Sequence, residues 1–251
     1  MKTRLLCGLG PLLALPTLGQ TVRADTSLLA ATNSLHQHYA SVLRDESGLY
    51  SGPAYVNYVR PGTPGHRFFD SDKPQTATIT YGGIIYAGVR ARYDLVRDQV
   101  VLSAQGGTAD LSLVTERVAC FTLGSHTFVR LSSDSALGLP ERNFYDLLVT
   151  GPVRVLASRR KKYEETLQDG HIVSELAART DYFLVQAGRS YPVSKLGDVL
   201  RQFPQQRAAL RSYARANQLE FDEARREAAI VALVQYRATL GLTDGSGQQD
   251  R

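Results

Sequence analysis

The residues of this sequence best suited to chemistry are two histidines that each follow a glycine-containing turn, His66 and His126. A histidine at a turn can act as an acid or a base or as a zinc ligand. No Cys-x-x-Cys pair or suitably spaced carboxylate accompanies them, which favours the alternative that both rings bond to backbone. His36 and His38 form a His-x-His pair, but on the helix predicted there the two rings point in different directions.

Signatures of several enzyme classes are absent from the sequence. It contains no Gly-x-Ser-x-Gly, no phosphate-binding glycine loop, no His-Glu-x-x-His and no calcium loop. We therefore expect a non-catalytic protein without a metal or cofactor. A hydrolase acting on envelope polymers stays open as an alternative, with carboxylates such as Asp94 and Asp146 as acid and base, because glycosidase carboxylates leave no short signature.

Aromatic residues concentrate in a segment rich in tyrosine, proline and glycine, residues 49–74. Such rings stack on sugars or line an apolar cleft, and the alternative is that they fill one end of a sheet. Together with the two turn histidines they form the candidate ligand-binding set, which is Tyr50, Tyr55, Tyr58, His66, Phe68, Phe69 and His126.

Arginine recurs at every fourth position in Arg207, Arg211 and Arg215, which places the three side chains on one face of a predicted helix. This face is a candidate partner-binding surface for phosphate, anionic lipid headgroups or an acidic protein. The densest basic run, residues 159–162, is followed by two glutamates and indicates a solvated face.

The first twenty-four residues resemble a secretory signal. Lys2 and Arg4 precede an apolar stretch, and small residues suited to cleavage end at Ala24. We expect a mature chain from Asp25 without a transmembrane segment, located in the periplasm or outside the cell, with or without outer-membrane association. Its roughly 225 residues are enough for one domain with a sizeable core.

The charge balance and the cysteines narrow the class further. The formal charge of +5 includes three basic residues of the signal, so the mature chain has only two more basic than acidic residues. This small excess and the export signal argue against a nucleic-acid partner. Cleavage also removes Cys7, which leaves Cys120 without a disulfide partner and makes an inert core thiol the expected state. The sequence indicates no particular oligomeric state.

Alternating apolar and charged residues between positions 89 and 95 predict a half-buried strand. Gly82-Gly83 joins two more predicted strands in a tight hairpin. Together these and other short strands span 77–81, 84–87, 89–95, 99–102, 110–115, 118–123, 126–131, 144–149, 153–157, 182–186 and 190–193. Turn residues between strands so short predict an antiparallel β-meander, because parallel strands need crossover helices.

Helical periodicity flanks these strands. Residues 28–42 predict an N-terminal helix, and beyond residue 193 the apolar period changes to that of three helices at about 194–241. Ser194 and Asp222 are suited to cap two of them, and Gly241 to end the last. The expected fold is α+β: a curved sheet or half-barrel in one domain, residues 25–242, followed by a polar tail, residues 243–251.

Several short motifs resemble an uncharacterised family of exported bacterial envelope proteins, over nearly all of the mature chain. They are Gly48-Leu49-Tyr50, Gly65-His66-Arg67-Phe68-Phe69, Tyr93-Asp94-Leu95, Phe121-Thr122-Leu123, Gly124-Ser125-His126-Thr127-Phe128, Phe144-Tyr145-Asp146-Leu147-Leu148 and Tyr191-Pro192-Val193. The resemblance brings no known activity, and no catalytic residue is carried over from it.

At the level of architecture, a first helix against a curved sheet is similar to periplasmic lipoprotein-carrier domains, which typically lack three closing helices. The leading hypothesis is therefore an envelope protein that binds an apolar or amphipathic ligand, such as a lipid or glycan, or another envelope component. A structural partner of an outer-membrane complex is the further alternative.

Overall fold

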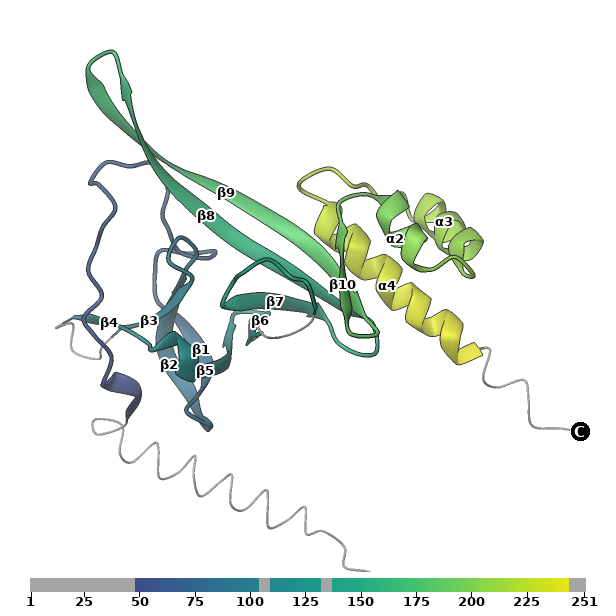
Figure 1. The fold of residues 1–251 in the computed structure, drawn as a ribbon, viewed down its shortest axis with the longest axis horizontal. Coiled ribbons are helices and arrows are strands. Elements are labelled where there is room, and N and C mark those ends of the chain that lie inside the picture. Colours follow the sequence, from purple (N-terminus) through teal and green to yellow (C-terminus); the bar gives the residue numbers. More distant parts are fainter. Residues whose placement is uncertain (1–47, 104–108, 132–136, 244–251) are drawn as a thin grey trace, which may run out of the picture.

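The computed structural model describes residues 48–103, 109–131 and 137–243 (Figure 1). Over these ranges the chain forms one open antiparallel sheet of ten strands and three α-helices, so the expected antiparallel sheet with C-terminal helices is confirmed. The predicted signal, the predicted helix at 28–42, the pair His36 and His38, and the tail from residue 244 lie outside the described residues.

The strands are β1 Gln75–Tyr81, β2 Ile84–Asp94, β3 Gln99–Ser103, β4 Asp110–Ser112, β5 Val118–Leu123, β6 His126–Arg130, β7 Phe144–Val149, β8 Arg154–Gln168, β9 His171–Gln186 and β10 Arg189–Val193. The helices are α2 Leu196–Gln202, α3 Arg207–Ala216 and α4 Arg226–Thr243, with short 3-10 turns η1 Gly48–Tyr50 and η2 Thr115–Arg117. The helix α4 runs past Gly241, so the prediction that this glycine ends it is wrong.

Two predicted strands are one in the structure. Residues 84–94 form the single strand β2, interrupted at Gly88, where the register against β1 shifts. Val89 faces Ala77 while Ala87 faces Thr78, so Gly88 is the extra residue of a β-bulge. Its φ of 72° suits glycine, which explains why the alternating pattern breaks there.

The strand order is β10-β9-β8-β7-β6-β5-β1-β2-β3-β4. It departs from a simple meander at one place, because β5 pairs with β1 and not with β4. After β4 the chain runs through η2, which lies beside the turn of the β1–β2 hairpin. There the Gly82 amide donates to the Arg117 carbonyl at 2.8 Å. Two runs of consecutive strands are thereby joined at β1 and β5.

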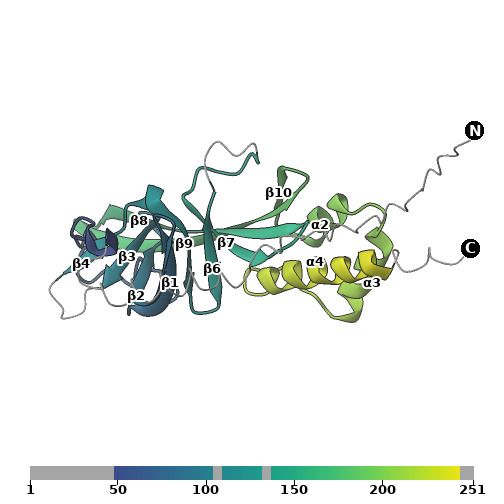
Figure 2. The same cartoon turned by 90° about the horizontal axis from the view of Figure 1, so that it is seen from below.

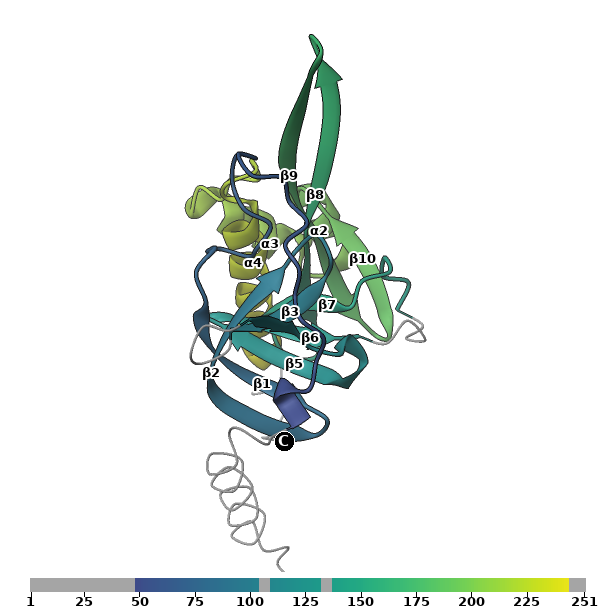
Figure 3. The same ribbon diagram turned by 90° about the vertical axis from the view of Figure 1, so that its left-hand side faces the viewer.

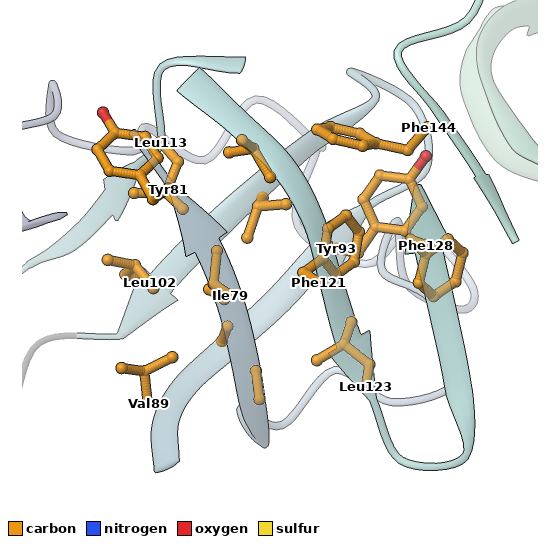
Figure 4. Close-up of a cluster of buried hydrophobic side chains, with 14 of the residues drawn as sticks. Ile79, Tyr81, Val89, Tyr93, Leu102, Leu113, Phe121, Leu123, Phe128 and Phe144 are labelled. Carbon is orange, nitrogen blue, oxygen red and sulfur yellow. The ribbon is translucent and has the colours of Figure 1, made fainter. Parts of the chain in front are cut away.

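The first hydrophobic core lies between β1, β2, β3, β5 and β6 (Figure 4). Tyr93 stands at its centre, with its ring 5.2 Å from Phe121 and 4.9 Å from Phe128 between centroids. Phe121 and Phe128 stack on each other, and Phe144 packs edge-on against Phe121. These buried rings hold the curved half of the sheet together.

A second core joins the C-terminal helices to β8, β9 and β10. Strand residues such as Val155 and Leu184 pack against Val199, Leu210 and Leu233 of the three helices, all at most 2% exposed. The helices cover one face at this end of the sheet, away from β1–β4 (Figure 2). Tyr145, Leu156 and Phe183 form a smaller cluster of their own.

The hairpin of β8 and β9 is much longer than the predicted strands 153–157 and 182–186. Fifteen residues of β8 pair with β9 in unbroken register from Arg154 to Gln168. The outer part projects beyond the other described elements (Figures 1 and 3). The sequence predicts only the inner part of each strand, because only the inner residues show the apolar run of a buried strand.

The basic run 159–162 lies on β8, so its side chains point alternately to the two faces of the strand. Arg159 and the Lys161 ammonium are turned toward the protein, and the latter donates to the carbonyls of His66 and Phe68 at 2.5 and 2.9 Å. Arg160 and Lys162 point outward. The prediction of a solvated face therefore holds for every second residue only.

Candidate functional site

Asp94, at the end of β2, is completely buried and gathers several of the predicted ligand-binding residues around it. The hydroxyls of Tyr55 and Tyr58 donate to its carboxylate at 2.5 and 2.7 Å. Two backbone amides, of Val96 and Arg97, donate to the other oxygen at 2.9 and 3.0 Å. Both oxygens of the buried carboxylate thus accept hydrogen bonds.

Arginines cover the aromatic rings of this cluster. The Arg67 guanidinium lies 4.7 Å from the ring of Phe68 and 5.3 Å from those of Tyr55 and Tyr58. Arg97 stacks on Tyr58 at 3.7 Å. The cluster anchors the irregular segment before β1 to the end of β2, where Phe68 forms an isolated bridge with Asp94.

Burial and the Asp94 charge change the ionisation of both tyrosines. Burial, followed by the hydrogen bond to Asp94, raises the pKa of Tyr55 to about 12. The same two causes raise the pKa of Tyr58 well above its usual value. Both phenols therefore stay protonated and keep donating to the carboxylate at neutral pH.

A second network surrounds Asp146 in β7, which is 1% exposed. Nδ1 of His126 lies 2.7 Å from Oδ2 of Asp146, and the Arg159 guanidinium donates to the same oxygen at 2.7 Å. Arg159 also donates to both carboxylate oxygens of Glu227 at 2.9 and 2.8 Å. Burial opposes the charge of Arg159, but the two carboxylates outweigh it and raise the pKa of the guanidinium.

The network ends at Tyr182, whose hydroxyl donates to Glu227 at 3.1 Å. Burial, then the charge of Glu227, raises the pKa of Tyr182 to about 12. The ring of Phe69 packs edge-on against His126 at 4.9 Å and lies under Arg159 at 5.5 Å. Two predicted ligand-binding residues, Phe69 and His126, thus belong to this second network and not to the Asp94 cluster.

A polar cleft of about 990 Å³ opens beside this network, between β9 and the first turns of α4. Three acidic side chains, Asp181, Glu223 and Glu227, line it. Its basic residues are Arg159, Arg179 and Arg226. A smaller hollow of about 250 Å³ continues it past the end of β10 toward Asp198.

The remaining predicted residues take structural positions. Tyr50 packs against the first core. His66 lends its carbonyl to Lys161, and burial, followed by the Lys161 charge, lowers the pKa of its ring. His66 and His126 share no contact among the described residues, so the two histidines do not form a joint zinc or acid–base site. The favoured interpretation, in which both rings bond to backbone, does not hold for His126, whose Nδ1 lies beside the Asp146 carboxylate.

Cys120 is only partly buried, and its thiol lies 3.4 Å from the Thr80 hydroxyl across the β1–β5 pair. The expectation of a core thiol is wrong because its side chain lies on the face of β5 opposite to that of Phe121. In the described part of the chain, no group of His, Cys, Asp and Glu side chains is arranged to hold a metal ion.

Arg207, Arg211 and Arg215 are exposed on α3, as the spacing predicted. Leu210 and Ala214 are buried on its opposite face, and Tyr213 stacks on Tyr236 of α4 at 4.0 Å. Within the described residues none of the three arginine side chains has an ion-pair or hydrogen-bond partner. The three arginines therefore form the exposed basic stripe that their spacing predicted, and the role of this stripe in partner binding stays a prediction.

The outer end of the β8–β9 ribbon, residues 164–175, is a feature that the sequence reasoning missed. Leu167 is 74% exposed, Ile172 50% and Val173 41%, and Leu167 pairs directly with Ile172. Exposed apolar residues that lie side by side are less common on a protein surface than single ones, and Leu167 and Ile172 are such a pair. The sequence does contain an indication of this hairpin, because two segments of strand length flank Asp169-Gly170, a dipeptide typical of tight β-hairpin turns.

No protein-family model matches this chain, and searches of curated proteins and of solved structures find no match either. None of the described helices combines the length and the apolar character that crossing a membrane requires.

Proposed function

We propose that this chain is a non-catalytic, exported envelope protein that binds another envelope protein through the outer end of the β8–β9 ribbon. The observation that carries the proposal is the exposure of Leu167, Ile172 and Val173 at the far end of a ribbon that projects away from the rest of the described residues. At a rise of about 3.3 Å per residue, residues 164–168 extend roughly 16 Å. A long apolar-tipped projection is costly to keep unless it meets a partner.

Charge placement on the ribbon supports the same proposal. Glu164 and Glu175 lie directly opposite each other on neighbouring strands. Like charges that face each other across a strand pair destabilise it. A local conflict of this kind is expected where a surface serves binding more than folding.

The other hypotheses receive less support. The aromatic residues proposed for an apolar ligand are engaged with Asp94, Arg67 or the first core, and Phe68 is only 3% exposed. The carboxylates proposed for a hydrolase, Asp94 and Asp146, lie in separate networks in which other side chains already donate to them. The apolar side chains at the outer end of the ribbon make no such contacts among the described residues, so they are available to a partner.

Site-specific photocross-linking in the exporting cell tests the proposal. A benzoylphenylalanine at Ile172 should form one discrete adduct in the envelope fraction, whereas the same probe at the exposed Ala208 of α3 should not. The substitution Leu167→Asp, on the neighbouring strand, should abolish the Ile172 adduct, because it places a charge in the apolar contact.

Equal labelling from both probe positions would contradict the proposal, and so would an adduct that survives Leu167→Asp. An adduct of twice the chain mass would identify a second copy of the chain as the occupant and would also contradict it. The matched control, Arg211→Gln, changes an exposed residue far from the ribbon and should leave the adduct unchanged.

A further inference from the structure

The direction of the backbone groups in β9 follows from two hydrogen bonds made by β8. The Lys161 amide donates to the Leu95 carbonyl at 3.2 Å, and the Arg159 carbonyl accepts from Arg142 at 2.9 Å. Both bonds point away from β9. Because the backbone groups of successive residues point to opposite edges, Arg160 is the residue that bonds to β9.

The same alternation applies to the partner strand. Arg160 pairs with Arg179, so Arg179 points its N–H and C=O toward β8. Ala178 and Thr180, which lie opposite Lys161 and Arg159, must point theirs toward the other edge of β9. That edge is covered by β10 only from Tyr182 onward, because Val193 is the last residue of β10 to pair.

This open edge is one wall of the polar cleft. Ala178 and Thr180 both line it, opposite the first turns of α4. Among the described residues, no backbone or side-chain group bonds to the edge-facing amides and carbonyls of these two residues. The outer edge of β8 is different, since Leu95, Arg142 and the segment around His66 already occupy part of it.

We infer that the open edge of β9 in this cleft receives an extended peptide segment, which pairs with Ala178 and Thr180 as an added strand. The inference rests on the proposed function, since it names the kind of segment that the partner supplies. Strand addition uses main-chain hydrogen bonds for affinity and side-chain contacts for selection. The edge runs on without interruption from the cleft to the exposed Ile172 and Val173 at the ribbon end.

The charges of the cleft indicate which peptide fits. Arg159 and Arg179 are paired with Glu227 and Asp181. The Arg226 side chain has no carboxylate partner in the described part of the chain and donates only to the Phe221 carbonyl, at 3.3 Å. A peptide with a carboxylate beside its pairing residues would supply the missing partner of Arg226.

A synthetic probe tests the inference directly. In the free protein the Thr180 amide should exchange with deuterium quickly, and it should become protected when acetyl-Thr-Val-Thr-Val-Glu-amide is added. The substitution Arg226→Gln should weaken binding about tenfold, the loss expected for one charge-assisted hydrogen bond. It should not change the affinity for the probe in which glutamine replaces glutamate.

Backbone methylation separates strand addition from loose charge attraction. Two probes, N-methylated on one or the other set of alternate amides, carry the same side chains and charge. One of the two should fail to bind, because it lacks the donors that face β9. Equal binding of both, no binding of the parent peptide, or slow exchange of Thr180 in the free protein would overturn the inference.

The substitution Thr180→Pro tests the edge in the natural complex. It removes only an edge-facing N–H, so the β8–β9 pairing should survive, as proline does at open strand edges. The Ile172 adduct should then be lost or strongly reduced. If Leu167→Asp abolishes the adduct and Thr180→Pro does not, the strand inference fails while the proposed function stands; if neither affects it, the proposed function fails.

Discussion

Arg159 of β8 donates to both carboxylate oxygens of Glu227 in α4, and so joins the sheet to the last helix. The same guanidinium neutralises Asp146, which lies beneath it at 1% exposure. The two carboxylates are therefore unequal, since Asp146 is buried while the Glu227 side chain is 29% exposed.

This inequality predicts an asymmetry between two variants. Arg159→Gln should lower the free energy of unfolding by about 3 kcal/mol, because it leaves the buried Asp146 charge without its main partner. Glu227→Gln should cost less than about 1 kcal/mol, since a partly exposed pair contributes little. Urea denaturation of both variants gives the comparison, and equal losses would contradict the assigned role of Asp146.

Asp198 predicts a dependence of stability on acid pH. Burial disfavours its charge, but hydrogen bonds from Ser194 and Lys195 outweigh burial and lower its pKa. A lowered pKa in the folded state stabilises the fold above the ordinary value of 3.8, and this contribution is lost as the pH falls below it. Asp198→Asn should therefore cost about 1 kcal/mol at pH 7.

The difference between the wild type and Asp198→Asn should narrow steadily below pH 4 in thermal melts. The exposed Glu223, changed to glutamine, serves as the control and should show no such convergence. A constant difference between the wild type and Asp198→Asn at all pH values would show that the carboxylate charge is not what stabilises the start of α2.

Tyr55 predicts the opposite dependence, at alkaline pH. Its pKa of about 12 in the folded state exceeds the ordinary value of 10, so the folded state is favoured below pH 10 and loses this advantage as the pH rises toward 12. Tyr55→Phe should destabilise the protein at pH 8, because it removes a donor to Asp94. The variant should then lose less stability than the wild type between pH 10 and 12. Thermal melts of the wild type and the variant across this pH range, followed by circular dichroism, test the prediction, and equal losses of stability in the two proteins would contradict it.

Leu233 and Arg211 form a matched pair of substitutions in the helical end. Leu233 is completely buried in the second core, whereas Arg211 is exposed. Leu233→Ala should lower the free energy of unfolding by about 2–5 kcal/mol. Arg211→Ala should change it by less than about 0.5 kcal/mol. A silent Leu233→Ala in chemical denaturation would mean that α4 does not complete the core.

Glu175 offers a substitution expected to stabilise the protein locally. Glu175→Lys replaces the repulsion with Glu164 by an attraction and should strengthen the outer ribbon by about 0.5 kcal/mol. Slower amide exchange at residues 173–177 would report the gain. The same change should weaken partner binding if the proposed function holds, and unchanged exchange would contradict the account of the charge conflict.

Much of the sheet was predictable from local pattern. The strand predicted at 144–149 agrees with β7 at both ends, and Gly82-Gly83 connects β1 and β2 as expected. Asp222 accepts the amides of Ala224 and Arg225 ahead of α4, as its predicted capping role requires. In all of these cases neighbouring residues determine the structure.

The candidate site was less accessible to sequence reasoning because its parts are distant in the chain. Arg159 and Glu227 are 68 residues apart, and Tyr58 and Asp94 are 36 apart. His66 and His126 both follow a glycine-containing turn in the sequence, but the fold places them apart. His126 lies beside Asp146 instead, across the β6–β7 pair. The outer ribbon, with water on both faces, shows no alternation for a pattern search to detect.

The open edges of the ribbon also bear on aggregation. Unpaired strand edges are templates on which a second copy can grow, and an apolar tip would add to that hazard. On this ribbon the facing pair Glu164–Glu175 concentrates negative charge near the tip of each copy. Two copies aligned in the same register would bring these concentrations together and repel each other. The facing glutamates that weaken the ribbon thus disfavour its pairing with a second copy in the same register, whereas a strand with a different charge sequence can pair with it without this repulsion.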